Sequence, residues 1–184
     1  MEKQTSLDLF FETGLRHLYK AEVAVFENLQ TLLETAMFQG LKDLFRHHRE
    51  ETSQQILRLE HVFKLLDIDI KASKLQGLPN LGDKAKELLK TLADMNFSDR
   101  SKGIDGILSE GKELLRHFAD TDANEIALIS AAQKVEHFEI ACYQLLVMLA
   151  EKYGDSQVAE LLLKSLEEEL QMEQKLSEFA DLNL

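Results

Sequence analysis

The chain has 184 residues, of which 45% are hydrophobic and 29% are charged, and its formal net charge is −12. A chain of this length folds by default as one domain with a sizeable core, so we expect residues 1–184 to form a single domain. Lysine and arginine are not clustered, which argues against nucleic acid or an anionic membrane surface as a partner, because both require basic patches. The single proline and eight glycines favour long helices and predict an all-α fold.

The sequence carries no signal for export or for insertion into a membrane. Its apolar runs are shorter than the ~20 residues that cross a bilayer, and its first residues lack the basic and apolar regions of a signal peptide. Cys142 is the only cysteine and cannot form an internal disulfide, which fits a reducing compartment. We therefore expect a cytoplasmic protein.

Apolar residues recur with helical spacing in the first third of the chain. The first long helix is predicted over about residues 6–36, with Ser6 or Asp8 positioned to cap its N-terminus. A short turn at Gly40 separates it from a second long helix over about residues 41–66. Because this break is short, the two helices should be antiparallel neighbours.

The stretch over about residues 67–122 differs, because it contains the only proline and just two short helical patterns, over about 83–95 and 107–118. Two further long helices are predicted over about 123–152 and 156–180, separated by a tight turn. The order is thus two antiparallel hairpins joined by one long crossover. This is the connection pattern of ferritin-like antiparallel four-helix bundles.

Several acidic residues fall on helix faces that are otherwise apolar. Helical projection at about 100° per residue places Glu22 at the centre of the apolar face of the first helix. Glu136 is central on the third helix, with Glu139 about 60° to one side, and Glu169 lies on the apolar face of the fourth. Lys134 points nearly opposite to Glu136. Buried carboxylates are therefore predicted on three helices.

The second helix presents a mixed polar patch. His48 and Gln55 fall inside its apolar stripe, and Glu51 lies at the edge of that stripe. Glu173 lies one turn beyond Glu169 on the fourth helix. Counting residues from the two tight turns places the polar groups of all four helices at similar heights. They are expected to form one interior layer.

Two interpretations of this layer remain open from the residues alone. Carboxylates so close together cannot all stay ionised in a core without a cation, and a pair of iron or manganese ions suits oxygen-rich sites with some imidazole. The alternative is a metal-free layer that is neutralised by protonation, by enclosed waters or by Arg58, which projects close to Glu51. Tyr143 is placed to donate a hydrogen bond to Glu136 or Glu139.

The chain also resembles a known family in strings that cover all four long helices: LYKAE (18–22), HHREETSQQILRLEHVF (47–63), ALISAAQKVEHFEIACYQLL (127–146) and LLLKSLEEELQMEQKLSEFA (161–180). These strings resemble the YciF-type (YciE/YciF) ferritin-like proteins of bacteria, which are related in fold to rubrerythrin and ferritin and are linked to stress responses. The resemblance implies a homodimer with a dinuclear iron or manganese carboxylate site in the bundle core. Carried over, the metal site comprises Glu22, Glu51, Glu136, Glu139 and Glu169, with His48, Gln55 and Glu173 as further candidates.

The sequence departs from the ferritin-like pattern in two ways. The usual Glu-x-x-His pair is missing, since Glu51 is followed at the third position by Gln54 and Glu169 by Met172. Residues 76–98 look like an insertion into the crossover. The resulting hypothesis is a stress-associated protein whose metal pair reacts with peroxide, oxygen or another small substrate. The alternative is a metal-free dimeric scaffold or regulatory protein with a vestigial carboxylate layer.

Overall fold

The structure, a computed structural model, describes residues 5–70 and 101–183. Within these two ranges it contains helices and no strand, which confirms the all-α prediction for this part of the chain. None of the described helices is long and apolar enough to cross a membrane. The helix predicted over 83–95 and the insertion over 76–98 lie outside the described residues. The helices are α1 (Ser6–Thr35), α2 (Gln39–Leu65), α4 (Lys102–Phe118), α5 (Asn124–Tyr153) and α6 (Ser156–Asn183).

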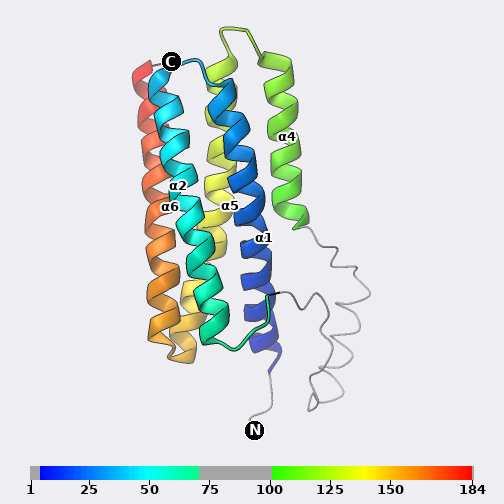
Figure 1. Cartoon of the computed structure of the whole chain (residues 1–184), viewed down its shortest axis with the longest axis vertical. Coiled ribbons are helices and arrows are strands. Elements are labelled where there is room, and N and C mark those ends of the chain that lie inside the picture. Colours follow the sequence, from blue (N-terminus) through cyan, green and yellow to red (C-terminus); the bar gives the residue numbers. More distant parts are fainter. Residues whose placement is uncertain (1–4, 71–100, 184) are drawn as a thin grey trace.

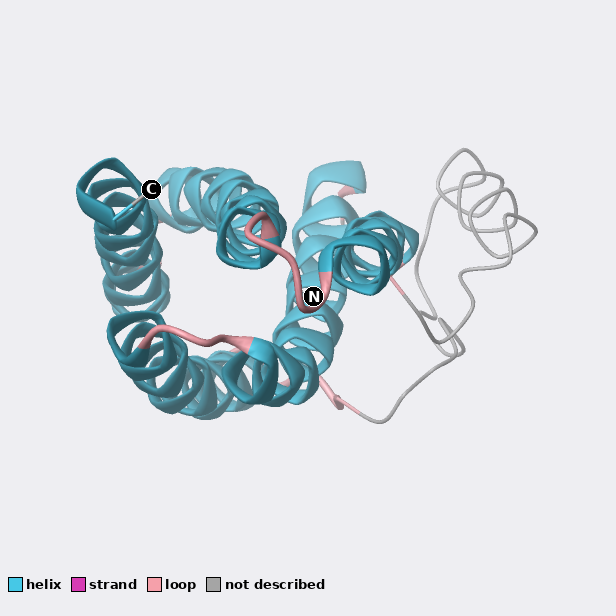
Figure 2. Ribbon diagram, turned by 90° about the horizontal axis from the view of Figure 1, so that it is seen from above, coloured by secondary structure: helices cyan, strands magenta, loops and turns pink. Residues whose placement is uncertain are grey.

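Four long helices, α1, α2, α5 and α6, run along the molecule and surround a common interior (Figures 1 and 2). Helix α1 packs against α2 and α5, and α6 packs against the same two helices. Figure 1 shows α1 and α6 running in one direction and α2 and α5 in the other. Each helix therefore turns one face to the interior and lies antiparallel to both of its direct neighbours.

The N-terminus of α1 is closed by a capping box. The Thr5 hydroxyl accepts a hydrogen bond from the Asp8 backbone N–H at 3.2 Å, and the Asp8 carboxylate accepts one from the Thr5 N–H at 2.6 Å. The N-cap is therefore Thr5, and the prediction of Ser6 or Asp8 as the cap is wrong. Asp8 contributes from the third helical position, where a carboxylate also interacts favourably with the helix dipole.

The connection between α1 and α2 was predicted at Gly40, and this position is wrong. The chain reverses over residues 36–38, and Gly40 lies inside the first turn of α2. A Cβ atom at Gly40 would come within 2.8 Å of the Phe179 ring on α6. Glycine at this position therefore permits close packing of α2 against α6 and does not form the turn.

The start of α2 is held by the start of α5. Glu125 is buried, and its carboxylate accepts hydrogen bonds from the backbone N–H groups of Met37 at 2.5 Å and Phe38 at 3.0 Å. The neighbouring Asn124 side chain donates to the Thr35 carbonyl at 3.3 Å. Phe38 is the N-cap of α2 and has no side-chain cap of its own. A carboxylate that is distant in sequence therefore satisfies the backbone N–H groups of the N-cap residue and of the residue before it.

Helix α4 lies outside the group of four and packs against α5 and, less extensively, against α1 (Figure 1). The sequence predicts only the C-terminal part of this helix, whereas it begins at Lys102. At Gly111 the contact with α5 is close, because an added Cβ would lie 3.2 Å from the Ala131 Cβ. Since α4 covers the outer side of α5, that helix is buried around most of its circumference, which explains its apolar sequence.

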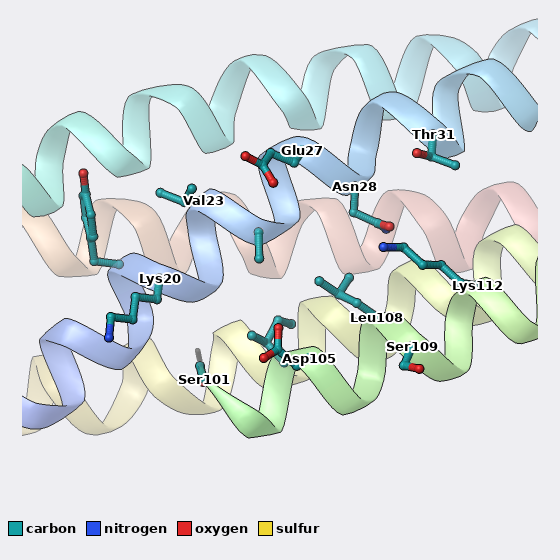
Figure 3. A pocket seen from close by; sticks show the side chains of 13 residues that line it. Lys20, Val23, Glu27, Asn28, Thr31, Ser101, Asp105, Leu108, Ser109 and Lys112 are labelled. Atoms are coloured by element: carbon teal, nitrogen blue, oxygen red, sulfur yellow. The ribbon is translucent and has the colours of Figure 1, made fainter. Parts of the chain in front are cut away.

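A surface groove of about 610 Å³ lies between α1 and α4 (Figure 3). It is lined by residues of mixed charge, among them Lys20 and Glu27 of α1 and Asp105 and Lys112 of α4. Its α1 residues are partly or fully exposed, whereas Glu22 of the same helix is buried. The groove is therefore separate from the interior polar layer.

The core consists of two hydrophobic clusters with a polar layer between them. On α2 one cluster ends at Phe45 and the other begins at Leu59, and on α6 the corresponding residues are Met172 and Leu166. The gap is filled by buried polar side chains from all four long helices. This layer comprises Glu22, His48, Thr52, Gln55, Glu136, Glu139, Ser165 and Glu169.

Candidate metal centre

Four side chains from three helices converge at the middle of the polar layer. They are His48 of α2, Glu136 and Glu139 of α5, and Glu169 of α6, and all four residues are buried. One nitrogen or oxygen atom from each lies within 4.8 Å of the corresponding atoms of the other three. One imidazole and three carboxylates form a donor set that suits divalent transition metals such as iron and manganese.

Apart from Glu169 Oε1, the side-chain polar atoms of this group lack hydrogen-bond partners. His48 Nδ1 lies 3.1 Å from Glu136 Oε1, and His48 Nε2 lies 3.6 Å from Glu169 Oε2. Despite these short distances neither ring nitrogen forms a hydrogen bond, and both oxygens of Glu136 and of Glu139 are also unpartnered. Buried polar atoms without partners are rare and costly in free energy. A cation coordinated by these atoms would satisfy them, so the residues fit a metal ion.

The carboxylates differ in how their surroundings shift their pKa values. Burial raises the pKa of Glu136 and of Glu139 well above the usual range, and the charge of Glu169 raises both further. For Glu169 burial also favours the protonated form, but the adjacent His48 imidazole and the Gln55 amide outweigh it and lower the pKa. Without a cation, the layer therefore favours protons on α5 and a negative charge on α6.

Glu22 flanks this group on α1. Its Oε1 accepts a hydrogen bond of 2.5 Å from the Tyr143 hydroxyl, while its Oε2 is buried and unpartnered. The prediction that Tyr143 donates to Glu136 or Glu139 is wrong, because α1 brings Glu22 to the height of the tyrosine. The charge of Glu22 raises the pKa of Glu139, so the two carboxylates are electrostatically coupled.

Two other predicted residues, Glu51 and Glu173, lie at the margin of the layer. The Glu51 side chain is 16% exposed, and its Oε1 lies 3.1 Å from Nε2 of His47, one turn earlier on α2. Its Oε2 is buried without a hydrogen-bond partner. Glu173 accepts a hydrogen bond of 2.9 Å from the Ser177 hydroxyl. Neither belongs to the converging group of four, and for both the role of metal ligand stays a prediction.

Gln55 connects the centre to an acidic neighbour. Its side-chain amide donates to Glu169 Oε1 and, at 3.2 Å, to Glu168 Oε2. Because the amide points its donor at Glu169, it acts on that carboxylate as an orienting group. Gln55, a predicted candidate ligand, therefore contacts a member of the group of four.

Two nearby cations are engaged elsewhere. The Arg58 guanidinium donates to the Glu168 carboxylate and does not pair with Glu51, so the expected neutralisation of Glu51 by this arginine is wrong. Lys134 points away from the centre as predicted, and its Nζ lies 2.6 Å from Glu110 of α4. The converging group is therefore not neutralised by either side chain.

His48 is more central than the sequence indicated. The usual ferritin-like search places a histidine three residues after a glutamate, whereas here His48 precedes Glu51 by three. The available signal was its position within the apolar stripe of α2, in step with Phe45, Thr52 and Gln55, all of which are buried. A His-x-x-Glu spacing on the inward face of a helix is therefore also a signal for a metal-ligating histidine.

Known proteins are similar to this chain in both sequence and fold. A family described as "Domain of unknown function (DUF892)" matches residues 6–100 and 84–183. Protein YciF of Escherichia coli strain K12 is 32% identical over 180 residues, which span 98% of this chain and 93% of YciF.

Solved structures agree with this match. The crystal structure of the E. coli stress protein YciF superposes with a TM-score of 0.77 at 29% identity, covering 96% of each chain. The structure of YcfI from Rhodopseudomonas palustris gives a TM-score of 0.73 at 31% identity, covering 96% of this chain and 95% of that one. A protein from Xanthomonas campestris pv. campestris shares the fold, with a TM-score of 0.64 at 22% identity over 96% of this chain and 92% of that one.

Proposed function

The chain belongs to the DUF892 family, and we propose that it is a ferritin-like metalloprotein that binds iron or manganese in its interior polar layer. The observation that carries this proposal is the group formed by His48, Glu136, Glu139 and Glu169, whose buried polar atoms converge and, apart from Glu169 Oε1, have no hydrogen-bond partner. Two antiparallel hairpins, α1–α2 and α5–α6, joined through a long crossover, support a ferritin-like four-helix bundle as the fold.

The proposed centre is dinuclear. The group of four supplies one imidazole and three carboxylates, and Glu22 and Glu51 flank it on α1 and α2. Of these two flanking carboxylates, Glu22 is the proposed further ligand of a second ion. The hydrogen bond from Gln55 to Glu169 and that from Tyr143 to Glu22 would fix the orientation of two carboxylates, as outer partners do at metal sites.

The proposed role is protection during stress, by reaction with peroxide or oxygen. A bound iron or manganese pair supplies redox chemistry that protein side chains lack. The chain itself contributes a site closed to bulk water, and Glu22 and Tyr143 hold a proton next to the group of four. The similarity to a protein described as a stress protein supports this role.

Metal analysis tests the proposal directly. Protein purified from metal-supplemented cells, or titrated anaerobically with ferrous ion, should contain up to two ions per chain. Glu136→Gln and Glu169→Gln should each abolish binding, while Glu167→Gln, an exposed change on α6, should leave it intact. A metal content near zero in the wild-type protein under both conditions would refute the proposal.

A metal-free scaffold or regulatory protein is the second candidate. The missing Glu-x-x-His pair on α2 and α6 favours it, because the remaining site has only one imidazole. In that case the protein as isolated from metal-supplemented cells should lose no stability on Glu136→Gln, since the change removes a buried acid. The metalloprotein should instead lose the stability that bound metal provides.

We further propose that the protein is a cytoplasmic homodimer, as its resemblance to YciF-type proteins implies. Light scattering coupled to size-exclusion chromatography should give twice the chain mass of 21.0 kDa. A particle of the chain mass would refute the dimer, and a cage-sized particle would indicate an iron store.

A further inference from the structure

A series of polar side chains on α2 leads from solvent to the buried group. The side chain of His47 is 49% exposed, that of Glu51 is 16% exposed, and those of His48 and Glu136 are 2% and 0% exposed. His47 Nε2 lies 3.1 Å from Glu51 Oε1, and His48 Nδ1 lies 3.1 Å from Glu136 Oε1. Three of these residues lie within positions 47–51 of α2, just over one helical turn.

The two oxygens of Glu51 have different surroundings. Oε1 contacts the exposed His47, whereas Oε2 is buried and has no hydrogen-bond partner. A surface pair with i,i+4 spacing stabilises a helix only slightly, and this gain is smaller than the cost of a buried, unsatisfied oxygen. Stabilisation of α2 therefore does not account for the position of Glu51. Glu51 instead offers one carboxylate oxygen near the solvent and a second, unpartnered oxygen on the buried side, and a cation moving inwards would contact them in turn.

The charges around Glu51 come from both α2 and α6. The positive groups facing it are His47 and His48 when protonated, together with Lys175 of α6, and Glu168 of α6 adds a negative charge. Glu168 is itself paired with Arg58 of α2, whereas Glu51 is close enough to the buried group that its charge raises the pKa of Glu136. Glu51 thus links the surface at the contact between α2 and α6 electrostatically to the buried group.

We propose that His47 and Glu51 form the entry route by which a divalent cation reaches the buried group between α2 and α6. This inference rests on the proposed metal centre and assigns Glu51 a role in transfer in place of that of a permanent ligand. His47 and Glu51 Oε1 would make the first contacts with the incoming ion, and Glu51 Oε2 would make the next contact on the inner side.

Transfer and ligation predict opposite kinetics. A residue that only lowers the barrier to passage speeds entry and exit equally, so its loss slows both and leaves the equilibrium affinity unchanged. Loss of a ligand instead speeds release and weakens binding. The rates of uptake and release therefore distinguish the two roles without any assay of activity.

The test uses the full-length protein stripped of metal and Co²⁺ as the probe, followed through the visible absorption of the bound ion. Uptake is measured by stopped flow and release by challenge with EDTA. Glu51→Gln and His47→Ala should slow both rates by about tenfold, the lower end of the acceleration that charged clefts provide. Stoichiometry and spectrum should stay as in the wild type. Glu50→Gln and His61→Ala, exposed changes on the same helix, serve as controls and should behave as the wild type.

Each other outcome overturns a defined statement. Faster release and a lower Co²⁺ content in Glu51→Gln would make Glu51 a ligand, which refutes the entry route but leaves the metal centre standing. Unchanged rates in both variants would also refute the route alone. A wild-type protein that takes up no Co²⁺ would refute the metal centre and the route together. Because the side chain of His47 is half exposed, His47→Ala should fold even if Glu51→Gln does not.

Discussion

Replacing Glu139 by glutamine should stabilise the metal-free protein at neutral pH. Both carboxylate oxygens of Glu139 are buried without a hydrogen-bond partner, and burial raises its pKa well above 4.5. The folded protein therefore holds this proton up to a higher pH than the unfolded chain does. Taking up this proton at a pH above the ordinary pKa costs folding free energy, and a neutral amide of the same shape avoids that cost.

The size of the effect has an upper bound. The ordinary pKa of this carboxyl is 4.5, and each pH unit between that value and pH 7 contributes about 1.4 kcal/mol if the group stays protonated when folded. Two and a half pH units give at most about 3–4 kcal/mol. The sign follows the raised pKa: the penalty is absent below pH 4.5 and grows as the pH rises towards the folded pKa. For a chain of this length the melting temperature would rise by up to about 10 °C.

Urea unfolding in EDTA at pH 7 and at pH 4.5 measures this effect. Glu139→Gln should be the more stable protein at pH 7 and should match the wild type at pH 4.5, whereas Glu151→Gln, an exposed change on α5, should have little effect at either pH. With metal present the order should reverse, since only the wild type gains stability from binding. Lower stability of Glu139→Gln at pH 7 in EDTA, or a gain that persists at pH 4.5, would refute the reasoning.

Three further substitutions should each lower the free energy of unfolding of the metal-free protein, measured in EDTA. Glu169→Gln should lower stability at pH 7 by about 2 kcal/mol, because Glu169 has a lowered pKa and accepts a hydrogen bond from Gln55. In urea titrations this loss should disappear as the pH falls below 4.5, where the carboxyl becomes protonated in both states. Tyr143→Phe should cost about 1–3 kcal/mol by leaving Glu22 without its donor, and no change in the urea midpoint would contradict this hydrogen bond. Glu125→Ala should lower the melting temperature, with a loss of about 1–2 kcal/mol, because two backbone N–H groups at the start of α2 lose their acceptor. A loss below about 0.5 kcal/mol, the usual size of a surface change, would exclude this capping role.

The four long helices could be predicted because amphipathic periodicity is a local property of the sequence. The connection before α2 could not be predicted in this way, because the residue that fixes it lies far away in the sequence. The carboxylate that caps α2 belongs to Glu125, which follows Phe38 by 87 residues. With no local cap in view, Gly40 was the only visible turn signal, although its role is to admit the Phe179 ring. A helix start that depends on tertiary contacts is hidden from local pattern analysis.

The same limit applies inside the polar layer. Projection of single helices correctly indicated that Glu22, Glu136 and Glu169 are buried, because the apolar neighbours that define each inward face are close in sequence. Pairing between helices depends on their relative height and rotation, which projection does not give. For this reason the partners of Tyr143 and Arg58 were predicted wrongly.

The balance of charge in the layer supports two ions over one. Four glutamates are fully buried, Glu22, Glu136, Glu139 and Glu169, and together they carry four negative charges when ionised. Two divalent cations would balance these charges, whereas a single ion would leave two charges that burial favours neutralising with protons. Because bound cations would replace protons on groups with raised pKa values, loading the site should release protons, and affinity should rise with pH. Proton release per ion, measured by calorimetry in buffers of different ionisation enthalpy, therefore reports how many carboxylates each ion engages.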